Sequence, residues 1–383
     1  MTSSPIGSFE ILTTTPLGSP INNLKSRLVY SEMYFSKPLP EGRKSYSVPK
    51  QELRSTRCFT TLEVKRAVNE PACDSALGKL RYDLARQLSK RNIKVPVSTE
   101  NKISGNWIAL IMPDAAPSRL GLMTRIASLV TMCSEAENRP APENITCDNF
   151  SQPFARDLAE TLPAPLDHHH TSDRRCNARA HQAIHNTIFE ISIEPVLYDL
   201  TSTDRSQGLE VLHAWYNQFH KSSTAISAAE TPSSLGEYMH KCSHLFPGYP
   251  WMSTLRYALG LHLEDAELET IEPAVAAAMQ SVALTRDYWA WPQASRSTDN
   301  IKRLRNAVAI SMVEMQCSEA QALSTVKNAA IAAESRFLDR RWSLMEVMGT
   351  EHSEVVMLLD AVEHFAAGNS LWCSSCPLYH GRR

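Results

Sequence analysis

Long apolar runs are missing from this sequence of 383 residues. No stretch approaches the roughly 20 consecutive apolar residues that a membrane-spanning helix needs. Residues 1–20 also lack the basic start and the continuous apolar segment of a secretory signal peptide. We therefore expect no membrane span and a cytoplasmic location.

An excess of charge of either sign is also missing. The chain has 39 basic and 41 acidic residues, which leaves a formal net charge of -2. Proteins that bind nucleic acid or anionic membranes usually carry a basic patch or stripe. We expect neither of these partners. Phosphate-loop and nucleophile-elbow motifs are absent as well.

Cysteine is present, but the pattern of a disulfide framework is not. Nine cysteines, an odd number, are scattered from Cys58 to Cys376, which is typical of reduced thiols in a cytosolic protein. Cys373 and Cys376 form a C-x-x-C, which can be a redox pair or half of a zinc site. Because no second pair and no βαβ pattern accompany it, we expect both to be free thiols.

Patterns typical of β-strands are nearly absent, and from about Asp74 onward the apolar spacing is helical. Three stripes at helical spacing predict buried helix faces. They are Ile271, Val275, Met279 and Val282; Leu304, Val308, Met312 and Met315; and Val355, Leu358, Leu359, Val362 and Phe365. We expect an all-α body.

Two segments lack this periodicity. Residues 1–57 predict an irregular N-terminal segment ahead of one domain that spans residues 58–383. Residues from about 138 to 173 are Pro-rich and polar and predict a loop. This loop contains His168, His169 and His170. Imidazoles bind zinc or nickel well, but adjacent histidines on a loop converge poorly on one ion, so a solvated loop is the preferred interpretation.

Four short blocks stand out along the chain. Residues 58–66 read CFTTLEVKR, residues 105–122 contain GNW, Pro113 and RLGL, residues 284–292 read LTRDYWAWP, and residues 368–380 read GNSLWCSSCPLYH. In this order they resemble FTTLPVR, the segment before the first metal-binding helix, LTNDYWSWP, and GN-x-x-W with CPRYH of fungal class I terpene cyclases of the fusicoccadiene and ophiobolin F synthase type. The resemblance covers residues 58–380 and implies the α-helical class I terpenoid synthase fold.

The resemblance implies chemistry that begins when an allylic prenyl diphosphate loses diphosphate. Magnesium ions held by oxygen ligands make diphosphate a workable leaving group. The family's D-D-x-x-D/E motif corresponds to residues 133–137, CSEAE, where only Glu137 matches a family carboxylate. The N, S and E ligands of its N-D-x-x-S-x-x-x-E motif correspond to Arg286, Ala290 and Ala294, while Asp287 is retained.

Two further diphosphate contacts of the family are altered or unplaced. The arginine of its C-terminal Arg-Tyr pair corresponds to Leu378, which Tyr379 follows. The arginine that senses diphosphate falls near Lys241 or Cys242, after an E-Y-M segment at residues 237–239. Its register is not fixed by the sequence.

These losses fall on metal and diphosphate contacts and leave the apolar scaffold in place. The catalytic candidates are Glu137, Asp287 and Tyr379, each of which also fits a helix-surface or capping role. Glu137 is in addition the candidate metal ligand. The expected substrate-binding residues are Arg286, Trp289 and Trp372.

Three functions remain open. The sequence favours a metal-independent cyclisation or isomerisation of a prenyl or terpenoid substrate, with no cofactor. The second is an ordinary magnesium-dependent diterpene or sesterterpene cyclase whose ligands lie elsewhere, for example at Glu264 or Asp265. The third is a non-catalytic protein that binds a terpenoid or a partner enzyme. Since the sequence holds no prenyl-chain synthase after His380, we expect a separate prenyltransferase to supply any prenyl diphosphate.

Overall fold

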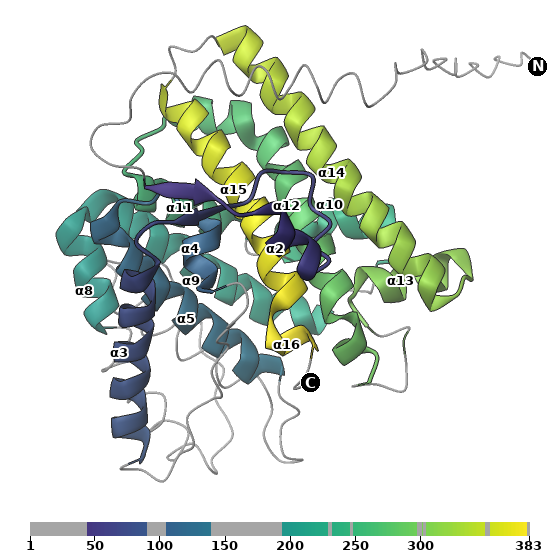
Figure 1. Ribbon diagram of the computed structural model, residues 1–383, viewed down its shortest axis with the longest axis horizontal. Coiled ribbons are helices and arrows are strands. Elements are labelled where there is room, and N and C mark those ends of the chain that lie inside the picture. Colours follow the sequence, from purple (N-terminus) through teal and green to yellow (C-terminus); the bar gives the residue numbers. More distant parts are fainter. Residues whose placement is uncertain are drawn as a thin grey trace, which may run out of the picture. The chain divides into compact units, whose positions relative to one another are not determined.

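Helices dominate the computed structural model of this chain (Figure 1). The described residues are 44–89, 105–138, 194–228, 232–245, 248–296, 301, 304–348 and 353–380. They all belong to one unit of the chain, Lys44–Arg383. Residues 1–43 and nearly all of the loop expected at 138–173, with its histidine triplet, lie outside the described residues.

The expected helical body is confirmed. In chain order its helices are α2 (Lys50–Ser55), α3 (Glu70–Ser89), α4 (Trp107–Ile111), α5 (Pro117–Asn138), α8 (Glu194–Thr203), α9 (Arg205–Ala228), α10 (Leu235–Leu245), α11 (Gly248–Leu259), α12 (Asp265–Ala294), α13 (Ala307–Met315), α14 (Glu319–Met348), α15 (Ser353–Ser375) and α16 (Pro377–His380). Within the described part of the chain, no helix is long and apolar enough to cross a membrane.

A short two-stranded sheet accompanies the helices in the described part of the chain. Strands β1 (Ser45–Ser47) and β2 (Lys65–Ala67) pair antiparallel, with Ser45 opposite Ala67. With α2, strand β1 also gives regular structure to residues 44–57, which the sequence analysis took as irregular. Val48 is 5% exposed, and its N–H donates to the Val64 carbonyl at 2.8 Å. This pairing is non-local, so composition alone does not reveal it.

Two of the three apolar stripes are confirmed. On α12, Ile271, Met279 and Val282 are buried and Val275 is partly buried. The stripe on α15 is buried throughout, from Val355 to Phe365. Helix α12 begins with a capping box, in which the Glu264 N–H donates to the Glu267 side chain at 2.9 Å.

The prediction that the stripe from Leu304 to Met315 is a buried helix face is confirmed only in part. Leu304 precedes α13, and Met315 is 44% exposed. Helix α13 is short because Asn306 caps its start, accepting the Val308 N–H at 2.8 Å, and because Gln316 ends it in the left-handed region at φ 49°. Only Val308 of this stripe is fully buried.

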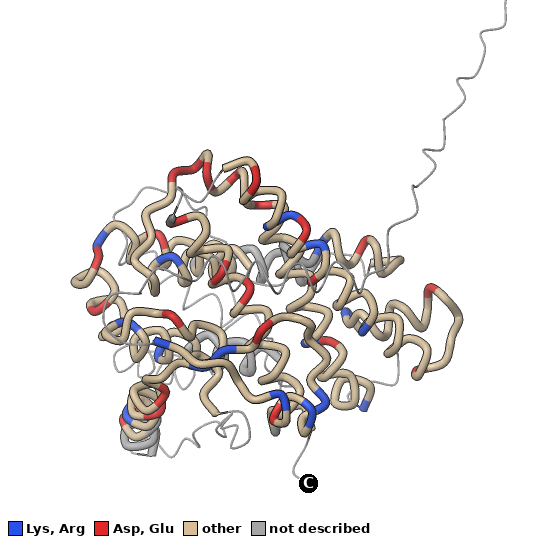
Figure 2. The backbone as a smooth tube through the Cα atoms, turned by 45° about the horizontal axis from the view of Figure 1, so that its top comes forward, with Lys and Arg blue, Asp and Glu red and all other residues tan. Residues whose placement is uncertain are grey.

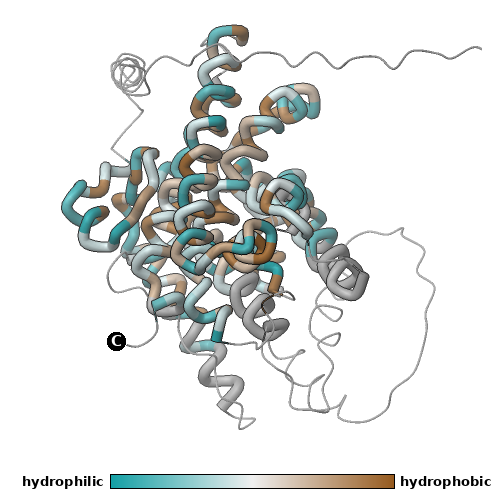
Figure 3. The backbone as a smooth tube through the Cα atoms, turned by 90° about the vertical axis from the view of Figure 1, so that its right-hand side faces the viewer, coloured by the Kyte–Doolittle hydropathy of each residue, from teal (hydrophilic) through white to brown (hydrophobic). Residues whose placement is uncertain are grey.

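Helix α12 packs against α14 and α15, and α15 packs against α4 and α11. Where α15 meets α4, a Cβ added to Gly368 would lie 2.2 Å from the Leu110 carbonyl oxygen. A glycine is therefore needed for this close approach. Figure 3 shows many of the apolar residues where helices face one another, and Figure 2 shows basic and acidic residues interspersed along the helices.

Candidate functional site

The last turns of α12 carry the stripe that the sequence analysis compared with a metal-binding motif. Arg286, Ala290 and Ala294 are spaced by four residues and lie on one side of the helix. All three are partly exposed, and 38% of the Arg286 side chain is accessible. Magnesium takes oxygen ligands, whereas this stripe offers one guanidinium and two methyl groups. The stripe does not fit a magnesium ion.

Asp287 lies beside this stripe but faces the protein interior. Its Oδ2 accepts hydrogen bonds from the Tyr238 hydroxyl at 2.5 Å and from the Ala307 N–H at 2.8 Å. Its Oδ1 lies 3.5 Å from Arg286 Nη2. Burial raises the pKa of Asp287, although Arg286 and the two hydrogen bonds act in the opposite direction. The carboxylate joins α12 to α10 and α13, and its catalytic role stays a prediction.

Tyr379 and Trp372 lie together. Their ring centroids are 6.1 Å apart in an edge-on arrangement. Burial raises the pKa of Tyr379 well above its usual value, so the phenol stays protonated at neutral pH. The Tyr379 hydroxyl also hydrogen-bonds the Cys373 thiol. Arg286 acts electrostatically on Tyr379, which places its charge near this pair.

Trp372 belongs to a group of rings that we call the aromatic interior. In this group the ring centroids of Trp215 and Trp251 are 5.2 Å apart, and those of Trp251 and Trp107 are 5.1 Å apart. Trp107 contacts Trp372 at 5.6 Å between ring centroids. The aromatic interior consists of Trp107, Trp215, Trp251, Phe365, Trp372 and Tyr379, contributed by α4, α9, α11, α15 and α16. Ring faces carry negative potential, so a ring of such a group can stabilise a cation that lies against its face.

Trp289, the other predicted substrate-binding tryptophan, has different neighbours. Its ring stacks on the Phe59 ring with a centroid separation of 6.1 Å, and its centroid lies 5.2 Å from that of the His380 ring. Tyr288 meets both Phe59 and Trp289 edge-on. Lys327 Nζ lies 5.6 Å from the centre of the Phe59 ring. Trp289 therefore packs against the segment that follows α2, and its substrate-binding role stays a prediction.

Several predicted positions are only partly described. The segment 133–137 with Glu137 forms the C-terminal turns of α5, but its side chains lie outside the described residues, as do those of Cys242 and Leu378. Lys241 is described: its Nζ lies 2.5 Å from Glu237 Oε1, one turn earlier on α10. Within the described ranges, no group of three or more His, Cys, Asp or Glu side chains is placed to hold a metal ion.

Cys373 and Cys376 are both buried, and within the described structure no disulfide joins them; that they are reduced thiols stays a prediction. Burial raises the pKa of the Cys373 thiol beyond the range of ordinary cysteines. A thiol reacts as its thiolate, so this pair is poorly suited to redox chemistry.

Sequence reasoning missed a buried carboxylate on α14. Glu334 accepts hydrogen bonds from Thr60 Oγ1 at 2.7 Å and from the N–H and Oγ1 of Thr61 at 2.7 and 2.8 Å. Ser281 of α12 donates to it at 3.3 Å. Burial raises the pKa of Glu334 despite these four donors. The two threonines belong to the CFTTL block, so that block holds the N-terminal segment against α14.

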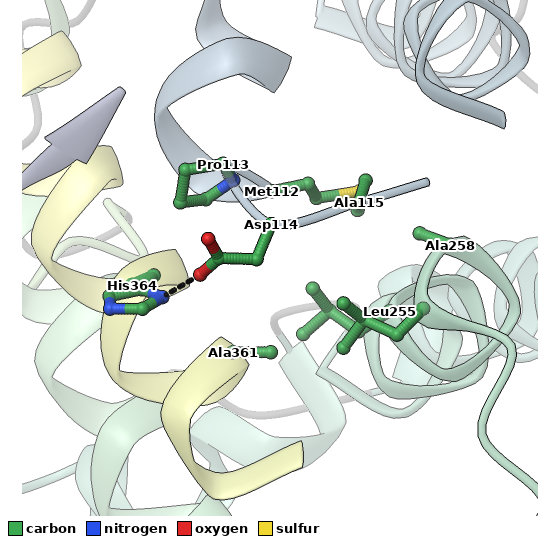
Figure 4. A pocket seen from close by; sticks show the side chains of 9 residues that line it. Met112, Pro113, Asp114, Ala115, Leu255, Ala258, Ala361 and His364 are labelled. Carbon is green, nitrogen blue, oxygen red and sulfur yellow. Dashed lines mark ion pairs between the residues drawn. The ribbon is translucent and has the colours of Figure 1, made fainter. Parts of the chain in front are cut away.

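A second missed pair lies where the α4–α5 connection meets α15 (Figure 4). His364 Nδ1 lies 2.9 Å from Asp114 Oδ2, and the Ser45 hydroxyl donates to Asp114 Oδ1 at 2.6 Å. Leu255 and Ala361 help to line the pocket beside this pair. Its volume of about 10 Å³ leaves room for roughly one water molecule. No sequence signal linked Asp114 to His364, which are far apart in the chain.

The sequence and the fold were compared with those of known proteins. Residues 150–336 match the family described as terpene synthase family 2, C-terminal metal binding. The chain is 26% identical over 336 residues to a bifunctional terpene synthase of Fusarium proliferatum, covering 87% of this chain and 42% of that protein. It is 27% identical over 334 residues to preterpestacin I synthase of Cochliobolus heterostrophus, covering 85% and 44%. The chain thus spans less than half the length of these relatives.

Solved structures of terpene synthases have a similar fold. Aristolochene synthase from Penicillium roqueforti superposes with a TM-score of 0.56 at 12% identity, covering 78% of this chain and 95% of that one. A 2-methylisoborneol synthase from Streptomyces coelicolor superposes with a TM-score of 0.58 at 13% identity, covering 89% and 97%. The chain therefore has the mostly helical class I terpene synthase fold and is similar in sequence to fungal bifunctional terpene synthases.

Proposed function

We propose that this chain is a terpene cyclase-like protein of fungal terpenoid biosynthesis. It binds a prenyl or terpenoid substrate in the aromatic interior and catalyses a metal-independent cyclisation or isomerisation there. The proposal rests mainly on one observation at the end of α12. There the side chains of Arg286, Ala290 and Ala294 offer no oxygen ligand to a metal ion. The names of the similar fungal proteins, all terpene synthases, support the substrate class.

In this proposal the aromatic interior shapes an apolar substrate and stabilises positive charge that develops on it. Arg286 supplies a fixed cation near Tyr379 that attracts an anionic group of the substrate. A cyclisation or isomerisation that starts by protonating an alkene ends by returning one proton, so it needs a group that gives and regains a proton. Asp287 and Tyr379 are the described candidates, and Glu137 at the end of α5 is the third.

A second function is favoured by one observation, because residues 150–336 match a family described as metal binding. Under that alternative the chain is a magnesium-dependent diterpene or sesterterpene cyclase whose ligands lie elsewhere than on the α12 stripe, for example at Glu264 or Asp265, with Glu137 as a further candidate. Both are proposed to act in the cytoplasm.

The deciding experiment measures turnover with and without magnesium. The purified chain is incubated with geranylgeranyl or geranylfarnesyl diphosphate, or with extracts of a host that expresses its genomic neighbours, in the presence of magnesium or of EDTA. Released diphosphate and terpenoid products are quantified. We expect no diphosphate release in either condition and a new terpenoid that forms equally well in EDTA. Diphosphate release that requires magnesium would establish the alternative, and binding without any product would indicate a non-catalytic protein.

A further inference from the structure

Asn369 places an amide with an unused donor inside the protein. The residue is 5% exposed, and its Nδ2 has no hydrogen-bond partner among the residues that the structure describes. On α15 it follows Phe365 by four residues and precedes Trp372 by three, so the three side chains share one helix face. Phe365 meets Trp251 and Trp372 meets Trp107. The amide therefore lies on the face that α15 contributes to the aromatic interior.

A short polar chain determines which way this amide is turned. The Tyr379 hydroxyl hydrogen-bonds the Cys373 thiol, and Cys373 Sγ donates to Asn369 Oδ1 at 3.7 Å. Burial raises the pKa of Cys373, so the thiol keeps the proton that it donates. Because the amide oxygen is engaged, the NH₂ group is the part of Asn369 left to bind something else.

Trp107 brings a second donor to the same part of the interior. Its Nε1 is buried and has no hydrogen-bond partner in the described ranges. Its ring lies against Trp251 and Trp372. Helices α4 and α15 come close together where Gly368 meets Leu110. Gly368 is the residue before Asn369, and Leu110 lies one helical turn after Trp107. Burying an N–H group without an acceptor is costly, so two such donors indicate that an acceptor normally reaches them.

We propose that the aromatic interior binds a terpenoid that carries a hydroxyl, carbonyl or ether oxygen, and that Trp107 Nε1 and Asn369 Nδ2 donate to this oxygen. The inference rests on the proposed function and names its substrate class as oxygenated terpenoids. The rings enclose the hydrocarbon skeleton. A hydrocarbon of the same shape leaves both donors unpaired and binds more weakly, which is how polar groups in apolar sites discriminate between ligands.

The experiment compares ligands that differ in oxygen but share one carbon skeleton. The diterpene alcohols geranylgeraniol and geranyllinalool are titrated against the hydrocarbon β-springene, and binding is followed by tryptophan fluorescence quenching. We expect at least one alcohol to bind roughly three- to tenfold more tightly than the hydrocarbon. Asn369→Leu and Trp107→Phe each remove one donor at similar volume and should reduce this preference. Thermal melting checks that each variant is folded.

Trp342→Phe is the matched control. Trp342 belongs to α14, outside the aromatic interior, and its Nε1 donates to Glu346 Oε1 at 2.9 Å, so this change should leave the alcohol preference unchanged. The inference is overturned if wild-type protein binds both ligand types equally, or if both donor variants keep the preference, because trapped water then satisfies the donors. Equal binding leaves the proposed function standing. If neither alcohol nor hydrocarbon binds, the proposed function itself fails.

Discussion

The Asp287 carboxylate accepts a 2.5 Å hydrogen bond from the Tyr238 hydroxyl. This bond joins α10 to the end of α12, and the Ala307 N–H binds the same carboxylate oxygen at 2.8 Å. Asp287 thus has a structural role that does not require a metal ion. The fold accounts for an aspartate here even though the residues around it provide no metal ligand.

Replacing Asp287 by Asn tests this role. We expect Asp287→Asn to lower the free energy of unfolding by about 1–3 kcal/mol, because an amide oxygen that keeps both donors of Oδ2 turns its NH₂ group towards the Arg286 guanidinium, which lies 3.5 Å from Oδ1. Tyr238→Phe should cost a similar amount. The double variant should cost less than the sum of the two, since one change weakens the Asp287–Tyr238 hydrogen bond and the other removes it. Urea unfolding measures all three, and strictly additive costs would contradict the coupling.

Glu334 should be essential for holding the N-terminal segment. Glu334→Gln replaces one accepting oxygen by an NH₂ group, which then faces either the two Thr61 donors at Oε2 or the Thr60 and Ser281 hydroxyls at Oε1, so we expect a loss of about 1–3 kcal/mol in unfolding free energy. Glu346→Gln on the same helix is the control, because Glu346 is exposed and, in the described part of the chain, accepts the Trp342 Nε1–H. Equal melting temperatures for the two variants would show that the threonines are not anchored by Glu334.

Alanine substitutions at Gly368, where α15 meets α4, and at Gly78 of α3 should have opposite effects on stability. Gly368→Ala places a Cβ 2.2 Å from the Leu110 carbonyl oxygen, so the helices must move apart and we expect a loss of at least about 2 kcal/mol. At Gly78 of α3 a Cβ meets nothing within 4 Å. Gly78→Ala should therefore raise stability by up to about 1 kcal/mol, as expected for an exposed helical position. Thermal unfolding separates the two.

The Asp114–His364 pair predicts a specific loss of stability in acid. Burial alone would raise the pKa of Asp114, but the neighbouring His364 and the Ser45 hydroxyl outweigh it and lower the pKa from 3.8 to about 2. A lowered pKa in the folded state stabilises the protein above about pH 4, and this contribution is lost as the pH falls towards 2.

The advantage of the wild type over Asp114→Asn should therefore shrink by about 1–2 kcal/mol between roughly pH 5 and pH 2. Urea unfolding at several pH values provides the measurement. Asp265→Asn, which removes an exposed carboxylate in the first turn of α12, controls for the loss of one negative charge. A difference that does not depend on pH would contradict the assigned pairing.

Restoring the family's ligands should create magnesium affinity. The variant combines Arg286→Asn, Ala290→Ser and Ala294→Glu with Cys133→Asp and Ser134→Asp. We expect calorimetry to detect magnesium binding at least about tenfold tighter than the millimolar or weaker binding expected of the wild type, because each ligand typically contributes 10–100-fold. The α12 triple change without the α5 changes is the control. Wild-type binding as tight as that of the variant would show that ligands lie elsewhere.

Several features of this protein follow from the sequence alone. The apolar stripes of α12 and α15 repeat at the helical period, and a helix that must bury such a stripe has little alternative. The four motif blocks then pointed to the class I terpene synthase fold. That residues 286, 290 and 294 share one helix face was also predictable from the sequence, because a spacing of four residues on one long helix places side chains on one side of it.

Only the tertiary structure showed what the carboxylates and rings do. The pairing of Asp287 with Tyr238, of Glu334 with Thr60 and Thr61, and of Asp114 with His364 joins residues that are far apart in the chain. The sequence predicted one role, substrate binding, for both Trp289 and Trp372, yet Trp289 packs on Phe59 and Trp372 belongs to the aromatic interior. Local periodicity determines which face of a helix is apolar, but the partners of that face depend on how all the helices pack together.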